Sequence, residues 1–299
     1  MTGFAAWLAG FRLRRVALIA GLFPLPLVSL MSAAIVVFTA EIKGGQEAFK
    51  DVAFALLALL LIELVAGGGQ GSVWFLGGAA LTLGFSGVLG TVLHKFRSLT
   101  LAVQLAVLIV AVGLLVFQIL IPDPQAFWLD FIERVTVQLT EQGFTGWETI
   151  PDEELANAMT LAIVISMTLA GLLALLLGSL LSCRLRGESF AARFQALKLG
   201  VIVGGVAAIS GLGALLGLAL ARDVLLVISI AFVFQGIAVV AAHVSRKGWQ
   251  PGWFGYVVAP LMVMVFVPVL AVFIGLGLAA TGFIDNWYSL RPQQGSGVV

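Results

Sequence analysis

Seven long apolar blocks dominate the sequence and decide what kind of molecule it encodes. They lie at about residues 50–66, 72–93, 98–121, 156–182, 196–221, 223–243 and 253–282. A membrane-spanning helix needs about 20 apolar residues, because the hydrocarbon core of a bilayer is about 30 Å thick. Charged residues make up only 10% of the chain, whereas soluble domains carry about 25%. The blocks therefore predict an all-α, polytopic transmembrane bundle of seven spans, forming a single integral membrane domain over residues 1–299.

An eighth apolar segment, at about 14–40, is split by two prolines in the stretch GLFPLPLVSL. Pro24 and Pro26 each remove a backbone donor and disfavour helix at the preceding residue. The segment is therefore either one kinked span or a hairpin that turns back at the prolines. A helical arm from Arg12 to Phe23 would extend only about 18 Å. If the segment turns back, the hairpin either crosses the bilayer fully or is re-entrant, and the sequence leaves both alternatives open.

The distribution of basic residues favours the hairpin. Lys and Arg near span ends mark the cytoplasmic side. With a hairpin, thirteen of the 16 Lys and Arg residues face the cytoplasm, and only Arg134, Arg222 and Arg291 face outward. A single kinked span with a cytoplasmic N-terminus places most of them outside. We therefore predict a protein of the bacterial inner membrane, with a cytoplasmic N-terminus and a periplasmic C-terminus.

The sequence predicts one sizeable periplasmic loop, at 122–155, that contains an amphipathic helix. Within the loop, Phe127, Phe131, Ile132, Val135 and Leu139 recur at spacings of three and four. This pattern is typical of a helix that lies in the headgroup plane. The helix either closes over a cavity as a lid or only anchors the loop to the bilayer.

Several polar residues fall inside or at the outward ends of the predicted spans. Ionisable groups inside a bilayer are costly and frequently functional. The hypothesis is an outward-facing polar pocket with Glu63 as ligand or proton site and Arg222 as its counter-ion. The alternative is that these groups serve helix packing, as a buried amide in a span can do. The candidate substrate-binding residues are Glu63, Gln118, Asn157, Arg222 and Gln235.

Other chemistries find little support. The single cysteine, Cys183, allows no intrachain disulfide and no CxxC site, and His94 and His243 lie at separate span ends. The chain has no GxxxxGK[ST], HExxH or GxSxG motif. A net charge of +1 without a basic tail gives no reason to expect nucleic acid. We predict no catalytic residues, no metal and no cofactor. The basic connector 183–198 is either a topogenic loop or a surface for anionic lipid or a partner.

Three short motifs carry a resemblance to a known family: PLP after the basic N-terminus, FVFQGIAVVAAH, and GFIDNWYSLR. Together they resemble the YybS-like family of bacterial membrane proteins, which is distantly similar to the S components of energy-coupling-factor vitamin transporters. Ile237 stands where the family usually has Leu. The family-motif positions are Pro24, Pro26, Gln235, Gly236, His243, Asp285, Trp287 and Arg291.

The resemblance and the polar residues together favour a transporter or a solute- or lipid-binding membrane component of S-component type. Its expected partners are membrane lipids, a small-molecule or lipid ligand, and a cytoplasmic or membrane partner protein. The alternative is a non-catalytic scaffold or assembly factor that packs against other membrane proteins. An intramembrane enzyme is the least supported class, because no span contains paired acids.

Overall fold

The computed structural model describes residues 3–25, 28–66, 72–141, 143, 151–247, 268–288 and 290–291, and within these ranges its regular secondary structure is entirely helical. Pro26, the first part of the predicted 253–282 block, most of 142–150 and the side chain of Leu139 lie outside the described residues. The helices are α1 Gly3–Gly10, α2 Arg12–Leu22, α3 Ser29–Lys43, α4 Gly45–Ala66, α5 Ser72–Phe96, α6 Leu99–Leu120, α7 Pro124–Glu141, α8 Asp152–Arg186, α9 Phe190–Gln195, α10 Gly200–Leu215, α11 Ala219–Arg246 and α13 Pro268–Trp287.

Four of the described helices are long and apolar enough to cross a membrane. They cover Trp74–Phe96, Leu99–Leu120, Asp152–Arg186 and Ala219–Arg246. Helix α4 is also long, but Glu47, Lys50 and Asp51 occupy its first two turns. Helix α10 has 16 residues and extends about 24 Å, which is shorter than the hydrocarbon core of about 30 Å. The structure therefore agrees with a membrane protein through four helices whose length and apolar composition suit a membrane span.

The boundary between the predicted 196–221 and 223–243 spans differs from the expectation. The two blocks place the link between them at position 222, because the charged residues Arg222 and Asp223 interrupt the apolar run there. In the structure the turn comes earlier, at 216–218, and both residues lie in the first turns of α11. Gly217 makes the turn with φ 83°, a backbone conformation that glycine adopts without strain.

Helices α2 and α3, which lie on either side of the proline segment, pack against each other. Helix α2 ends at Leu22, and the Leu25 amide donates to the Leu22 carbonyl over 3.2 Å, where the turn begins. Arg15 at the start of α2 pairs with Asp51 near the start of α4, with Nε and Oδ2 2.6 Å apart. Because Asp51 follows α3 by eight residues, the start of α2 and the end of α3 lie together.

Helix α3 lies between its neighbours α5 and α8, and all its residues from Ser32 to Glu41 are buried. Two glycines allow this close packing. A Cβ at Gly90 of α5 would lie 2.7 Å from the Val37 carbonyl oxygen, and one at Gly178 of α8 would lie 2.8 Å from the Ala34 carbonyl oxygen. The backbones of α5 and α8 can approach α3 only because these positions have no side chain.

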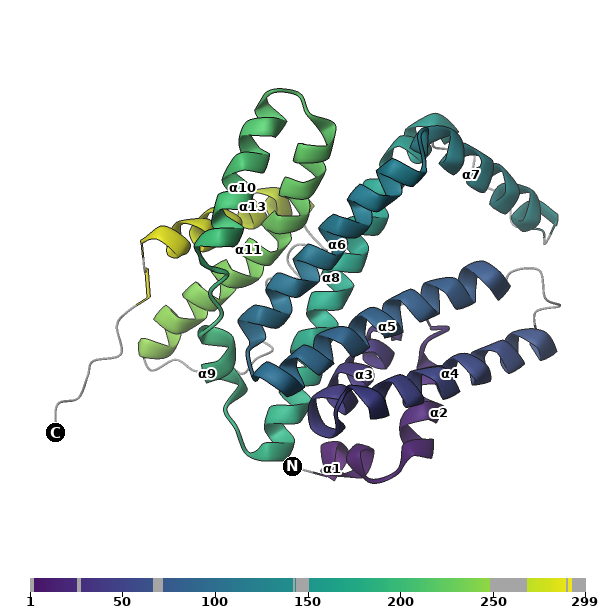
Figure 1. Cartoon of the computed structure of the whole chain (residues 1–299), viewed down its shortest axis with the longest axis horizontal. Coiled ribbons are helices and arrows are strands. Elements are labelled where there is room, and N and C mark those ends of the chain that lie inside the picture. The colour runs from purple at the N-terminus through teal and green to yellow at the C-terminus, as the bar shows by residue number, and fades with distance from the viewer. Residues whose placement is uncertain are drawn as a thin grey trace.

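Helix α13 runs across α11 in Figure 1. The crossing depends on a reciprocal pair of glycines. A Cβ on Gly236 of α11 would overlap the Leu278 carbonyl group of α13, and one on Gly282 of α13 would overlap the Phe232 carbonyl group of α11. This contact fixes where the last described helix meets the bundle.

The bundle has two chemically different ends. At one end α7 projects from the tops of α6 and α8 (Figure 1); we call this the α7 end. At the opposite ends of α5 and α8 lie several arginines, and we call this the arginine end. It contains Arg12, Arg15, Arg97, Arg186 and Arg193.

Candidate functional site

Helix α7 forms where the amphipathic pattern predicts it, and local chemistry sets its start. Pro124 occupies the first helical position, where a missing amide hydrogen costs nothing. The carboxylate of Asp123 accepts a hydrogen bond of 3.0 Å from the Ala126 amide, which caps the first turn. At its base, Trp128 Nε1 donates to Thr160 Oγ1 of α8 over 2.7 Å. Helix α7 is therefore fixed to the bundle at one end.

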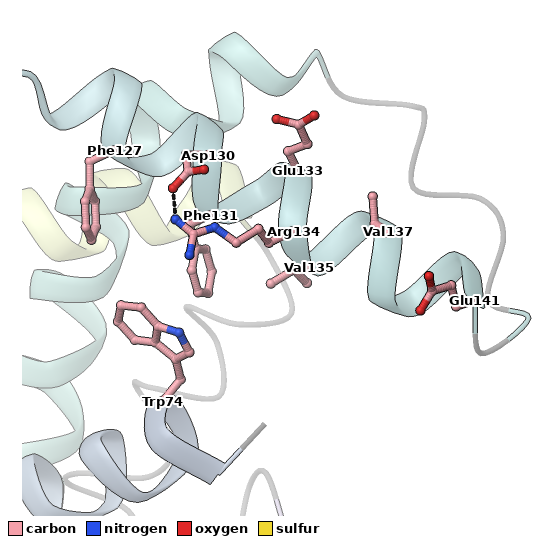
Figure 2. A pocket seen from close by; sticks show the side chains of 9 residues that line it. All are labelled: Trp74, Phe127, Asp130, Phe131, Glu133, Arg134, Val135, Val137 and Glu141. Carbon is pink, nitrogen blue, oxygen red and sulfur yellow. Dashed lines mark hydrogen bonds and ion pairs between the residues drawn. The ribbon is translucent and has the colours of Figure 1, made fainter. Parts of the chain in front are cut away.

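A cavity of about 600 Å³ lies between α7 and the first turn of α5 (Figure 2). Trp74 of α5 faces Phe131 of α7, with the two rings edge to face and their centroids 5.5 Å apart. The cavity is lined by Trp74, Phe127, Asp130, Phe131, Glu133, Arg134, Val135, Val137 and Glu141. Helix α7 thus covers a hollow space rather than packing along its whole length on the bundle.

The lining of this α7 cavity is amphipathic. Phe127, Phe131 and Val135 follow one another at spacings of four on one face of α7. The polar lining has three carboxylates and one guanidinium, and Arg134 pairs with Asp130 one turn away. Glu133 and Glu141 have no ion-pair partner among the described residues. The cavity therefore combines aromatic and aliphatic contacts with an acidic rim.

Among the described residues, no hydrogen bond, ion pair or cavity lining joins the five predicted substrate-binding residues. Glu63 and Gln118 are half-buried and Asn157 is exposed, and none of the three lines the α7 cavity. The proposed counter-ion Arg222 instead pairs with its neighbour Asp223, at 3.1 Å. Residues that the sequence predicts at the same depth in a membrane need not be neighbours. The rotation of each helix about its axis and the order of helices in the bundle decide which side chains meet.

Gln235 is the exception, and it is completely buried at the centre of a polar network. Its Oε1 accepts a hydrogen bond of 2.9 Å from the Leu199 amide. Its Nε2 donates to Asp285 Oδ2 over 2.9 Å and to Asn286 Oδ1 over 3.0 Å. Asn286 Oδ1 also accepts from the Gly200 amide over 3.0 Å. The amide of Gln235 is thus used entirely inside the protein.

This network closes a break in the helix path between α9 and α10. Residues 196–199 are not helical and leave backbone groups without helical partners. Gln104 of α6 donates to the Leu199 carbonyl over 2.6 Å, and Arg291 donates to the carbonyls of Gln195 and Leu197. Arg291 also pairs with Asp285, at 3.0 Å. Side chains from α6, α11 and the C-terminal segment therefore supply hydrogen-bond partners to the backbone groups of this non-helical stretch, as an apolar environment requires.

The position of this network differs from the prediction for the C-terminal segment. A last span that ends at the predicted periplasmic C-terminus would place Asp285 and Asn286 at the outward surface, level with Arg222. Instead they contact Gln235, which lies thirteen residues further along α11, or about 20 Å. Polar residues after an apolar block resemble an interfacial end, but here they serve the backbone at 196–200.

Most residues of the two C-terminal motifs that carry the family resemblance lie in or next to this network. Gln235, Asp285 and Arg291 are joined by hydrogen bonds, and Gly236 makes the contact with α13. Trp287 is half exposed and packs near Gly204. The remaining motif residue, His243, is exposed, and its Nδ1 lies 2.9 Å from the Val239 carbonyl oxygen of its own helix. Pro24 is exposed in the turn that follows α2.

A second buried charge, Glu41 at the arginine end, was not identified from the sequence. Its Oε1 accepts from Arg193 over 2.7 Å and from Arg186 over 3.1 Å, and His94 Nδ1 lies 2.8 Å from its carbonyl oxygen. Burial acts to lower the pKa of Arg193, but hydrogen bonding and charge attraction from Glu41 outweigh burial and raise it. The rule that flagged Glu63, a carboxylate in an apolar run, would also have flagged Glu41.

Comparisons with protein-family models, with curated proteins and with solved structures find no match for this chain. Within the described ranges, no three His, Cys, Asp or Glu side chains gather closely enough to hold a metal ion. The functional argument therefore depends on the cavities and the charges of this chain.

Proposed function

We propose that the chain is a solute- or lipid-binding membrane component, of the kind that serves transport, and that it holds an amphipathic ligand in the cavity beneath α7. The observation that carries the proposal is the hollow of about 600 Å³ between α7 and Trp74. Ligand sites for small molecules usually enclose about 300–1,000 Å³ and combine apolar walls with a few polar groups. The α7 cavity meets both descriptions.

The lining restricts the class of ligand. Trp74, Phe127 and Phe131 offer ring surfaces for the apolar part of a ligand. The charged part of the lining has three carboxylates and only one guanidinium, so its net charge is negative. An anionic head would be repelled by this rim. The ligand is therefore an amphiphile whose polar part is neutral or positively charged, such as an amine with an apolar tail.

The distribution of basic residues supports one orientation of the bundle relative to the membrane. With the arginine end in the cytoplasm, positive charge accumulates on that side and the α7 cavity opens outward. In this arrangement the hairpin α2–α3 keeps both its ends on the cytoplasmic side, and α4, α10 and α13 join the four long apolar helices to make the predicted seven spans of a bacterial inner-membrane protein. The break between α9 and α10 resembles the discontinuous helices of transporters, whose midplane backbone is satisfied by neighbouring side chains.

The test is native mass spectrometry of the full chain, purified in mild detergent, with the variants Trp74→Ala and Phe131→Ala. We expect a co-purified amphiphile whose occupancy falls several-fold in both variants. Phe273→Ala removes an exposed ring on α13, far from the cavity lining, and should leave the occupancy unchanged. Equal occupancy in all three variants would contradict the assignment.

A scaffold role is the second candidate, and α10 is the observation that favours it. This helix is shorter than the bilayer core, yet Ile202 and Ile209, which are seven residues apart on one face, expose most of their surface. A partner helix packed on this face would cover them. Absence of any bound amphiphile, together with a second membrane protein in stoichiometric amount in the same spectra, would favour the scaffold.

A further inference from the structure

A second cavity, of about 490 Å³, lies at the arginine end. It is lined by Arg97, Glu188 and Arg193. Arg97 directly follows α5, Glu188 comes two residues after α8, and Arg193 lies on α9. None of these residues belongs to the Gln235 network or to the α7 cavity.

The arginine-end cavity and the α7 cavity lie at opposite ends of α5. Trp74 lines one cavity near the start of this helix, and Arg97 lines the other just after its end. A helix of 25 residues extends about 37 Å, which exceeds the hydrocarbon thickness of about 30 Å. If α5 crosses the bilayer as the proposed function requires, the arginine-end cavity lies level with the lipid headgroups of the leaflet opposite α7.

The three lining charges are held apart rather than neutralised against each other. No ion pair joins Glu188 to Arg97 or Arg193 among the described residues, and neither Glu188 nor Arg97 has another ion-pair partner there. Arg193 is held in place because one of its terminal nitrogens contacts Glu41, Ser179 and Cys183. The cavity thus presents one fixed guanidinium, one exposed guanidinium and one exposed carboxylate.

From this arrangement we propose that the arginine-end cavity binds a zwitterion with a phosphate and a primary ammonium, namely the phosphoethanolamine headgroup of a phospholipid. The phosphate lies between Arg97 and Arg193, because guanidinium groups match phosphate oxygens in two-pronged hydrogen bonds. The ammonium donates to Glu188. A purely anionic headgroup would be repelled by Glu188, and a choline headgroup has no N–H to donate to it.

The cavity itself does not decide between the lipid and a free zwitterion of the same chemistry. Its level in the bilayer favours the lipid. The inference does not depend on the α7 cavity, and its failure would leave the proposed function untouched.

The experiment is native mass spectrometry of the full chain, delipidated in detergent and titrated separately with phosphatidylethanolamine, phosphatidylcholine and phosphatidylglycerol. We expect phosphatidylethanolamine to bind about tenfold more tightly than the other two lipids, which corresponds to one charge-assisted hydrogen bond. Free phosphoethanolamine is added in a parallel titration. Binding of the lipid alone identifies a headgroup site, whereas equal binding of the free compound identifies a soluble zwitterion as the ligand.

Three exposed positions provide the variants. Glu188→Gln should abolish the preference for ethanolamine over choline, and Arg97→Gln should weaken binding of both lipids about tenfold. Arg184→Gln removes a positive charge near the end of α8, outside the cavity lining, and it should leave the binding of both lipids unchanged. Equal binding of the ethanolamine and choline lipids to the unmodified chain, or equal losses in Glu188→Gln and Arg184→Gln, would overturn the proposal.

Discussion

Buried polar side chains hold this molecule together at the scale of single residues. Gln235, Asp285 and Glu41 have no exposed surface. Gln235 donates a hydrogen bond to Asp285, which lies 50 residues later in the chain. A buried polar group costs free energy unless it is paired, so each partner in such a network depends on the other.

We predict that Gln235→Leu destabilises the protein by about 2–4 kcal/mol, because the Leu199 amide loses its acceptor and the side-chain oxygens of Asp285 and Asn286 each lose a donor. Thermal unfolding in detergent, followed by fluorescence, measures the change. Gln118→Leu is the matched control, since Gln118 is half-buried and has no hydrogen-bond partner among the described residues. A similar loss in both variants would show that the network does not contribute specifically.

We predict that Glu41→Ala also destabilises the protein. It leaves Arg186 and Arg193 without their shared carboxylate, and removing one partner of a buried ion pair typically costs about 3–5 kcal/mol. Because both arginines keep some exposed surface, we expect the lower part of this range. Glu63→Ala, which breaks no ion pair in the described structure, should leave the unfolding midpoint nearly unchanged. Equal shifts in the midpoint would contradict this assignment.

Close backbone contact decides how the elements pack. Helix α3 is enclosed by α5 and α8 through Gly90 and Gly178, and α13 crosses α11 through Gly236 and Gly282. In lipid, helices gain little from burying apolar side chains against each other, so close contact of this kind contributes a large share of the packing energy.

We predict that Gly282→Ala destabilises the contact between α11 and α13 by about 1–3 kcal/mol, since the new methyl group meets backbone atoms that cannot rotate away. Gly277→Ala, on the same helix, has nothing within 4 Å and should be neutral. Unfolding midpoints of the two variants, measured in the same detergent, provide the comparison. The packing argument fails if Gly277→Ala is as harmful as Gly282→Ala.

At the scale of the whole molecule, charge separates the two ends. The α7 cavity has an acidic rim, and the opposite end carries Arg186, Arg193 and Arg97. A membrane would fix this asymmetry relative to its two faces.

We predict that positions 43 and 141 lie on opposite sides of the membrane. In a Cys183→Ser background, Glu141→Cys should react with a membrane-impermeant maleimide in intact spheroplasts, and Lys43→Cys should react only after permeabilisation. Both positions are exposed, so access to solvent does not limit either reaction. Labelling of both positions from the same side would refute the orientation.

Sequence reasoning succeeded where one local pattern was sufficient. The apolar blocks predicted helices, and the spacing of Phe127, Phe131 and Val135 predicted α7. It did less well where distant segments meet. No local spacing indicates that Arg15 lies against Asp51, or that Asp285 lies against Gln235 rather than at a membrane surface. Which faces of the helices meet is decided by packing of the complete bundle.

The helix break at 196–199 has a consequence for biosynthesis. Its carbonyl and amide groups are satisfied by Asn286 and Arg291, which follow them by 86 to 96 positions. A nascent chain therefore carries the α9–α10 segment without these partners until residues 286–291 have been synthesised and can fold back onto it. A stop codon at position 285 would remove both partners and leave these backbone groups exposed.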